Sequence, residues 1–188
     1  MTLLQTIVGP LKHEDFSWWT VPFAFLLALF PRICFTFLGP GGNYFNTLNP
    51  RVHALYIRRA VELDPITRGR IERSEYALNN AIENLPLFAV AVLAANVNEL
   101  EVETRNILSL LYIIFRLTYT WVYIWGQDYY SIPLFTRTVV WLSANITLGY
   151  LYLLPGPPSI NELEAKHSFW LTRTIKLPHN PALEGLVQ

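Results

Sequence analysis

The sequence predicts an all-α integral membrane protein built as a four-helix bundle, and three observations carry this prediction. The 188 residues are 52% hydrophobic and only 15% charged, whereas soluble domains average about 25% charged residues. Four apolar stretches approach the roughly 20 residues that a helix needs to cross a hydrocarbon core of about 30 Å. Aromatic residues, 14% of the chain, gather near the ends of several stretches, where membrane proteins place their aromatic belts.

The four predicted membrane helices follow one another, with short connections after the second and the third. They cover about residues 18–38, 76–97, 107–125 and 133–154. Trp18 and Trp19 mark one end of the first helix, and Trp121 and Trp125 mark the end of the third. Short connections make consecutive helices antiparallel neighbours in a bundle. We therefore assign residues 1–155 to one membrane domain.

A long polar segment, residues 39–73, separates the first two helices and opens with the turn sequence Gly39-Pro40-Gly41-Gly42. This segment contains six arginines against three acidic residues. Because Arg and Lys near membrane helices favour the cytosolic side, we expect this loop in the cytosol and both termini in the lumen or outside. Residues 156–188 form a polar, proline-rich tail without a long apolar period.

The composition also limits the chemistry of the protein. A formal net charge of zero gives no reason to expect a nucleic-acid partner. We find no zinc-binding spacing and no glycine-rich nucleotide motif, so we expect no metal site. The single cysteine, Cys34, excludes an internal disulfide and a paired-cysteine redox centre, and we interpret it as a small buried apolar side chain.

A polar stripe interrupts the third predicted helix. Arg116, Tyr119 and Tyr123 are spaced i, i+3, i+7, so they share one helix face. A guanidinium at the centre of a membrane helix costs about 2.5–3.5 kcal/mol on insertion scales, and a simple lipid-facing anchor offers nothing to offset that cost. We therefore expect this stripe to face the interior of the bundle.

The second predicted helix carries a matching stripe, Tyr76, Asn80 and Glu83, on a single face. Polar groups in hydrocarbon must find partners, and two interpretations follow. In the first, Glu83 and Arg116 form an interhelical ion pair that only fixes the packing. In the second, the two stripes hold a polar ligand between helices, which the large number of hydrogen-bonding groups favours.

The fourth predicted helix opens with a third polar set, Arg137, Thr138, Trp141 and Asn145, in which Arg137 and Trp141 lie one turn apart. Arg137 could contact the same ligand, or its long side chain could extend to the lipid headgroups. The residues alone leave both interpretations of Arg137 open.

Several segments resemble the MAPEG family, the membrane-associated proteins of eicosanoid and glutathione metabolism. Residues 70–88, which include Asn80 and Glu83, resemble the signature of the family's second helix. The Arg–Tyr–Tyr stripe of the third helix is similar to the pattern of a leukotriene-forming member. Residues 30–32 and 49–51 are similar to a less characterised branch of the family.

This resemblance covers about residues 18–154 and implies a four-helix subunit that forms a homotrimer, with the endoplasmic reticulum as the expected membrane. Glutathione would bind as a co-substrate between neighbouring subunits, near the cytosolic face. The implied glutathione-binding residues are Arg73, Asn80, Glu83, Arg116, Tyr119 and Tyr123. Arg137 matches the arginine that catalytic members place near the thiol, and Thr138 beside it is the available hydroxyl.

The implied activity is that of a glutathione-dependent enzyme acting on a lipophilic substrate from the bilayer, by conjugation, peroxide reduction or isomerisation. Glutathione reacts as its thiolate, and a free thiol has a pKa of about 8.5, so a cation or hydroxyl donor must stabilise it. Many members have an arginine and a histidine where this chain has Tyr76 and Leu78. This departure keeps two alternatives open, an enzyme on the same scaffold that uses no glutathione and a non-catalytic lipid-binding membrane protein.

Overall fold

The computed structural model describes residue 9, residues 11–128, 132–133 and 135–156, and residues 164 and 168. The chain divides into two units, Met1–Pro155 and Gly156–Gln188, and the predicted polar tail falls almost entirely outside the described residues. Every element of regular structure in the described ranges is helical. The all-α prediction is therefore confirmed for this part of the chain.

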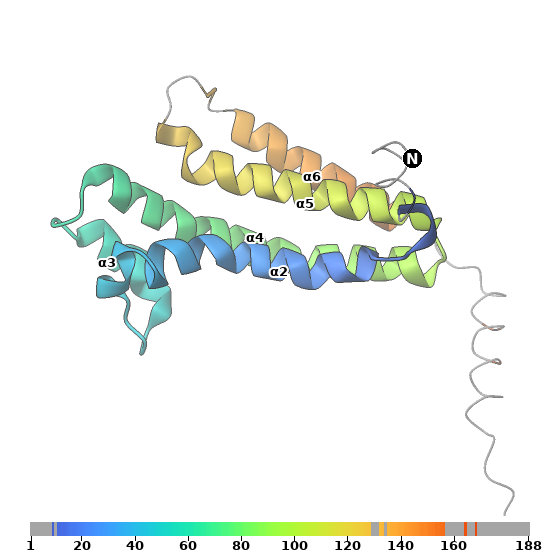
Figure 1. Cartoon of the computed structure of the whole chain (residues 1–188), viewed down its shortest axis with the longest axis horizontal. Helices are drawn as coiled ribbons and strands as arrows, with labels where there is room; N and C mark the ends of the chain where they lie inside the picture. Colours follow the sequence, from blue (N-terminus) through green and yellow to red (C-terminus); the bar gives the residue numbers. More distant parts are fainter. Residues whose placement is uncertain are drawn as a thin grey trace, which may run out of the picture. The chain divides into compact units, whose positions relative to one another are not determined.

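Four long helices make up the described part of the first unit. They are α2 (Ser17–Arg32), α4 (Pro65–Val97), α5 (Val102–Ile124) and α6 (Thr136–Leu153). Shorter segments connect them: the π-helical η1 (Ile33–Phe37), then η2 (Pro40–Tyr44), η3 (Pro50–Val52), α3 (His53–Arg59) and, after α5, η4 (Gly126–Asp128). Figure 1 shows α2 beside α4 and α5 beside α6, with α3 at one end of the bundle.

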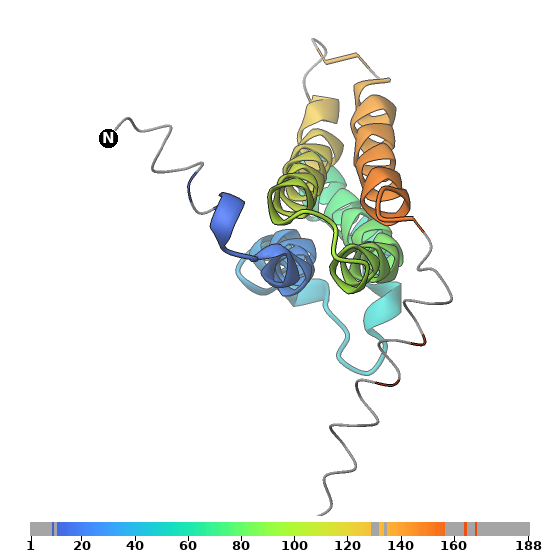
Figure 2. The ribbon, with the colours of Figure 1, turned by 90° about the vertical axis from the view of Figure 1, so that its right-hand side faces the viewer.

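α4 is the central helix, because it contacts α2, α5 and α6; Figure 2 shows the bundle end-on. The Phe88 ring of α4 stacks on the Tyr112 ring of α5, with the ring centroids 4.0 Å apart. Ala91, Ala95 and Ala144 are buried around this pair. Small side chains allow membrane helices to approach closely, so the core is held by close helix contact around one aromatic stack.

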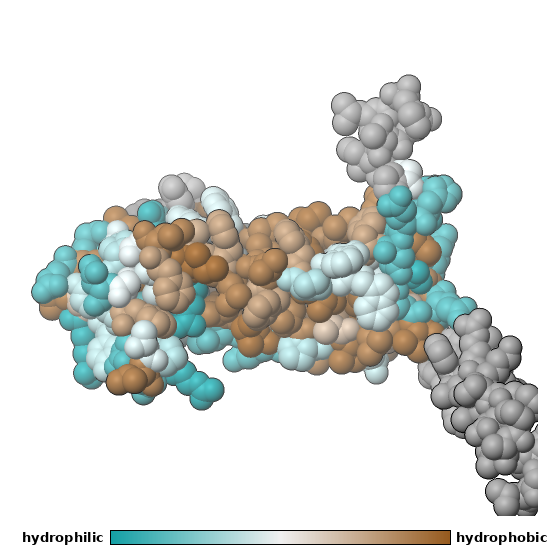
Figure 3. Space-filling view, turned by 60° about the horizontal axis from the view of Figure 1, so that its bottom comes forward, coloured by the Kyte–Doolittle hydropathy of each residue, from teal (hydrophilic) through white to brown (hydrophobic). Residues whose placement is uncertain are grey.

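Three helices among the described residues are long and apolar enough to cross a membrane. They span Ser17–Phe37, Pro65–Val97 and Val102–Asp128, where the first three membrane helices were predicted. α6 packs against α5 but does not belong to this set, so its crossing of the membrane stays a prediction. In Figure 3 an apolar band lies between two polar ends of the bundle, as expected for a protein embedded in a bilayer.

The second helix begins earlier than predicted, so Tyr76 is wrong as its start. α4 begins at Pro65, inside the segment that we expected to be a polar loop. Asp64 Oδ1 accepts hydrogen bonds from the backbone nitrogens of Ile66 at 3.0 Å and Thr67 at 3.2 Å, and proline suits the first helical position. Apolar periodicity marks the part of a helix that lies in the membrane, whereas the cap decides where the helix starts.

The glycines at the start of the connecting segment allow η2 to fold back against η1. A Cβ added to Gly39 would lie 2.7 Å from the Phe35 carbonyl oxygen, and one added to Gly42 would lie 2.8 Å from the Thr36 carbonyl oxygen. Such contacts are too short for any residue with a side chain. The predicted glycine-dependent turn is therefore confirmed.

Candidate functional site

A pocket of about 340 Å³ opens between α4, α5 and α6. Its lining is polar and aromatic and consists of Tyr76, Asn80, Tyr119, Tyr123, Arg137, Thr138 and Trp141. Small-molecule sites typically have volumes of about 300–1,000 Å³, so this pocket is of a useful size, and we call it the main pocket. It brings together residues from all three polar sets that the sequence indicated.

Two cation–aromatic pairs lie at the main pocket, one with Arg137, which lines it, and one with Arg116, which does not line it but contacts Tyr119. The guanidinium carbon of Arg116 lies 5.1 Å from the centroid of the Tyr119 ring, and that of Arg137 lies 5.1 Å from the centroid of the Tyr123 ring. The Tyr119 and Tyr123 rings stack, with centroids 5.6 Å apart. A cation above an aromatic face is attracted by the ring electrons, so this arrangement fixes both guanidinium groups relative to α5.

Arg116 is buried, with 5% of its surface exposed. Its Nη2 donates a hydrogen bond to Asn80 Oδ1 at 3.0 Å, while its Nη1 has no hydrogen-bond partner among the described residues. The ion pair with Glu83 that the sequence allowed is therefore not formed within the described chain. A buried cation bonded to a neutral amide lacks a counter-charge, and this makes the region favourable for an anion.

Glu83 does not reach the main pocket, so the prediction of one shared stripe on the second helix fails at this residue. At about 100° per residue, Asn80 lies about 40° to one side of Tyr76 and Glu83 about 20° to the other. Glu83 lines a second pocket of about 760 Å³ between α2, η3, α3 and α4. Tyr76 contributes to both pockets, so α4 separates two polar sites.

Arg73 is bound to the end of α5 and does not line the main pocket. Its Nε donates to the Ile124 carbonyl oxygen at 2.8 Å, and its Nη2 pairs with Asp128 Oδ1 at 2.7 Å. Arg70 Nε pairs with the other oxygen of the same carboxylate at 2.6 Å. No spacing in the sequence signals this contact, because Asp128 lies in the short helix η4 after α5. Arg73 therefore forms a clamp between α4 and α5, and its predicted role in ligand binding stays a prediction.

Replacing Asp128 by asparagine is expected to destabilise the protein by about 1.5–3 kcal/mol, because two arginines lose their charged partner. The free energy of unfolding in detergent measures this change. Glu103→Gln is the control, since its ion pair with Lys12 (3.5 Å) is more exposed and such pairs contribute about 0–1 kcal/mol. Equal losses in the two variants would contradict the clamp.

A buried cluster of charged groups, which the sequence did not reveal, lies beside the second pocket. Glu75 Oε1 lies 3.1 Å from Arg32 Nε, 3.3 Å from Thr36 Oγ1 and 3.7 Å from His53 Nδ1. His53 Nε2 lies 3.2 Å from the Gly41 carbonyl oxygen. Burial, together with nearby Arg32, lowers the pKa of His53 and favours the neutral ring. These residues come from five elements, α2, η1, η2, α3 and α4, so no local spacing could have found them.

The fold and the main pocket define a class, an α-helical integral membrane protein with a polar site between its helices. The model of the MAPEG family matches residues 17–156, and the chain belongs to this family, as the sequence motifs predicted. No curated protein and no solved structure matches the chain. Membership of this family indicates that the chain is a membrane protein related to the proteins of glutathione and eicosanoid metabolism.

Proposed function

We propose that this protein is a glutathione-dependent membrane enzyme that acts on a lipophilic substrate by conjugation, peroxide reduction or isomerisation. The observation that carries the proposal is the meeting of Arg137 and Thr138 with Asn80, Tyr119 and Tyr123 around one pocket. Every one of these side chains can donate a hydrogen bond, and no carboxylate lines the pocket among the described residues. Such a lining favours an anionic ligand, and a glutathione thiolate fits it.

We assign the thiol to Arg137 and Thr138, the first two residues of α6 after Thr136. The guanidinium stays charged throughout the physiological pH range and is held above the Tyr123 ring. Lowering a thiol pKa from about 8.5 by two units takes about 2.7 kcal/mol of thiolate stabilisation. Charge-assisted hydrogen bonds from Arg137, with a further one from the Thr138 hydroxyl, supply an energy of this size.

The remaining wall of the main pocket would bind the peptide portion of glutathione. The Asn80 amide is already oriented by Arg116, and the stacked rings fix the directions of the Tyr119 and Tyr123 hydroxyls. Donors that are ordered before binding lose little conformational entropy when the ligand arrives. Arg116 would add positive charge beneath the peptide, since no carboxylate neutralises it within the described residues.

The exposed carboxylate of Glu83 supports the further proposal that the protein assembles as a homotrimer. Its side chain is exposed on α4, and no described residue pairs with its carboxylate. Asn79 is exposed on the same side of the helix. Because unpaired charges on membrane helices face protein or water rather than lipid, a neighbouring subunit is the natural cover for this surface. Glutathione at that interface would lie between the second pocket of one subunit and the main pocket of the next.

The lipophilic substrate would reach the main pocket from the bilayer, past α6. Val139, Leu142 and Ile146 are about half exposed on this helix, and Trp141 of the same helix lines the pocket. α6 would then be the fourth membrane helix. We place the protein in the endoplasmic reticulum membrane, with the α3 end in the cytosol, where glutathione keeps thiols reduced, and with both termini in the lumen.

Two residues favour a second candidate, an enzyme on the same scaffold that uses a hydrophobic metabolite without glutathione. Leu78 is buried and apolar. The Tyr76 hydroxyl accepts a hydrogen bond from Arg58 Nη2 at 3.1 Å and donates one to Glu72 Oε1 at 3.3 Å. Neither residue offers a cation to the carboxylates of glutathione. A non-catalytic lipid-binding protein is a weaker candidate, since it would leave the placement of Arg137 at the pocket without a use.

Mixing the detergent-purified protein with glutathione distinguishes these candidates. We expect a saturable thiolate absorbance in the ultraviolet near neutral pH, where free glutathione is mostly a thiol. S-methylglutathione is the matched control, because it keeps the peptide but has no thiol. It should compete for binding and give no thiolate signal. Saturation with glutathione without any such absorbance would refute the proposal and leave the second candidate.

A further inference from the structure

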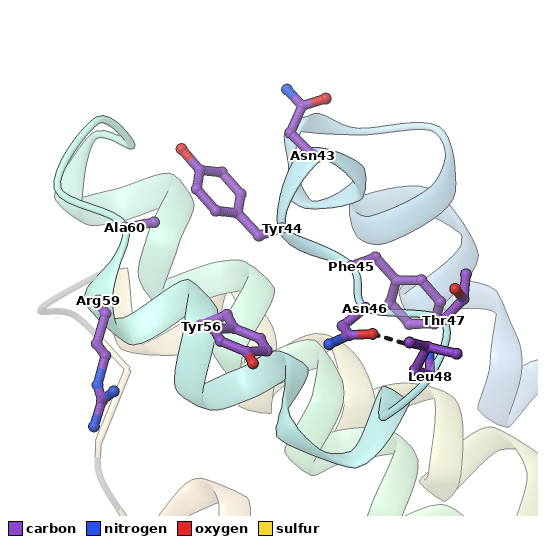
Figure 4. A pocket seen from close by; sticks show the side chains of 9 residues that line it. All are labelled: Asn43, Tyr44, Phe45, Asn46, Thr47, Leu48, Tyr56, Arg59 and Ala60. Atoms are coloured by element: carbon purple, nitrogen blue, oxygen red, sulfur yellow. Dashed lines mark hydrogen bonds between the residues drawn. The ribbon is translucent and has the colours of Figure 1, made fainter.

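A third pocket, of about 460 Å³, lies outside the candidate active site, in the segment that joins α2 to α4. Figure 4 shows its two walls, one formed by residues 43–48 and the other by Tyr56, Arg59 and Ala60 at the end of α3. The flanking membrane spans end at Phe37 and begin at Pro65. The pocket therefore lies at the end of the bundle, where the chain leaves the hydrocarbon.

The lining of this third pocket offers hydrogen-bond donors and, among the described residues, no carboxylate. The Arg59 guanidinium and the hydroxyls of Tyr56 and Thr47 have no hydrogen-bond partner in the described part of the chain. Asn46 accepts a hydrogen bond from the Leu48 backbone nitrogen at 2.9 Å through Oδ1 (Figure 4), which leaves its Nδ2 able to donate. A guanidinium accompanied by neutral donors suits phosphate oxygens.

Apolar side chains at the same end of the bundle are exposed to an unusual degree. Leu48, which lines the pocket, is 94% exposed, and Val61 and Leu38 are 87% and 80% exposed. Burial of such surface is worth about 25 cal/mol per Å², so these side chains favour an apolar medium. Tyr56 and Tyr44 in the lining are of the type that gathers at the membrane–water boundary. The connecting segment therefore has the character of an interfacial layer.

We propose that this third pocket binds the phosphate headgroup of a membrane phospholipid, with Arg59 on the phosphate and Leu48, on the opposite wall (Figure 4), beside the acyl chains. One nearby charge opposes the ligand. The Glu62 carboxylate accepts a hydrogen bond from the Tyr44 hydroxyl at 2.8 Å, which brings a negative charge close to the lining. Removing that charge strengthens phosphate binding, whereas removing Arg59 weakens it.

Native mass spectrometry of the full chain in detergent, with dioleoyl phosphatidic acid as the probe, tests the proposal. We expect retention of phosphatidic acid in preference to dioleoylglycerol, which has the same acyl chains and no phosphate. Arg59→Gln is expected to weaken retention about tenfold, as for the loss of one charge-assisted hydrogen bond. Glu62→Gln is expected to strengthen it. Arg51→Gln is the matched control, because Arg51 belongs to the same segment but lines the second pocket.

Three results would overturn the proposal. Equal weakening by Arg51→Gln and Arg59→Gln would show a general attraction of the basic segment for anions. Equal retention of phosphatidic acid and dioleoylglycerol would show that the phosphate is not recognised. Displacement of phosphatidic acid by an excess of inorganic phosphate would assign the pocket to soluble phosphate compounds instead of lipid. Because Arg59 is exposed and unpartnered within the described residues, its substitution leaves the fold intact.

Discussion

Replacing Arg137 by glutamine is expected to lower glutathione-dependent turnover about 25-fold near pH 7, with little effect on glutathione binding. Glutamine can still donate hydrogen bonds but carries no charge. If the thiol pKa returns by two units to about 8.5, the lost stabilisation is about 2.7 kcal/mol, and the thiolate fraction at pH 7 falls from about three quarters to about 3%. Arg137 is exposed at the start of α6, so the variant should fold.

The dependence of turnover on pH separates this electrostatic role from a purely structural one. In the Arg137→Gln variant, turnover should rise with pH and approach that of the unmodified protein above about pH 8.5. A structural defect would lower turnover at every pH. Tyr123→Phe is the matched control, because it keeps the ring beneath the guanidinium and should leave the pH midpoint unchanged. A midpoint that does not move in Arg137→Gln would assign Arg137 to the lipid headgroups instead.

The parts of the site that could be predicted from the sequence lie within single helices. Arg116, Tyr119 and Tyr123 share a face because 3.6 residues complete one helical turn, and the contacts between neighbouring members of this set follow from that spacing. The cost of a charge in hydrocarbon then requires the face to point inward. Local periodicity and one desolvation argument were enough for this half of the main pocket.

The placement of the other site residues depends on which helices flank α4. No short stretch of the sequence shows which helices these are. Glu83 and Asn80 differ by about 60° around the helix, and this difference places them in separate pockets because α2 and α3 lie on one side and α5 and α6 on the other. Arg73 is bound through Asp128, 55 residues away. Contacts between distant segments decide these outcomes.

Replacing Glu75 by alanine is expected to destabilise the protein by about 3–5 kcal/mol, because it removes the buried carboxylate that pairs with Arg32, whose side chain is only 21% exposed. Glu75 is 6% exposed and joins α4 to η1 and to α3 through Thr36 and His53. Removing a buried partner is costly even where the whole ion pair contributes little net stability. Unfolding in detergent, followed by circular dichroism, measures the loss.

Glu72→Ala is the matched control, since Glu72 lies on the same helix and pairs with Arg58, whose side chain is 60% exposed. Such pairs contribute about 0–1 kcal/mol, so the two variants should differ by several kcal/mol. The double variant Glu75→Leu with Arg32→Met removes both charges and keeps apolar volume, and it should recover much of the loss. Two results would contradict this explanation. Glu75→Ala could lower the free energy of unfolding no more than Glu72→Ala does, or the double variant could be as unstable as Glu75→Ala. In either case an unpaired charge would not be the cause of the lost stability.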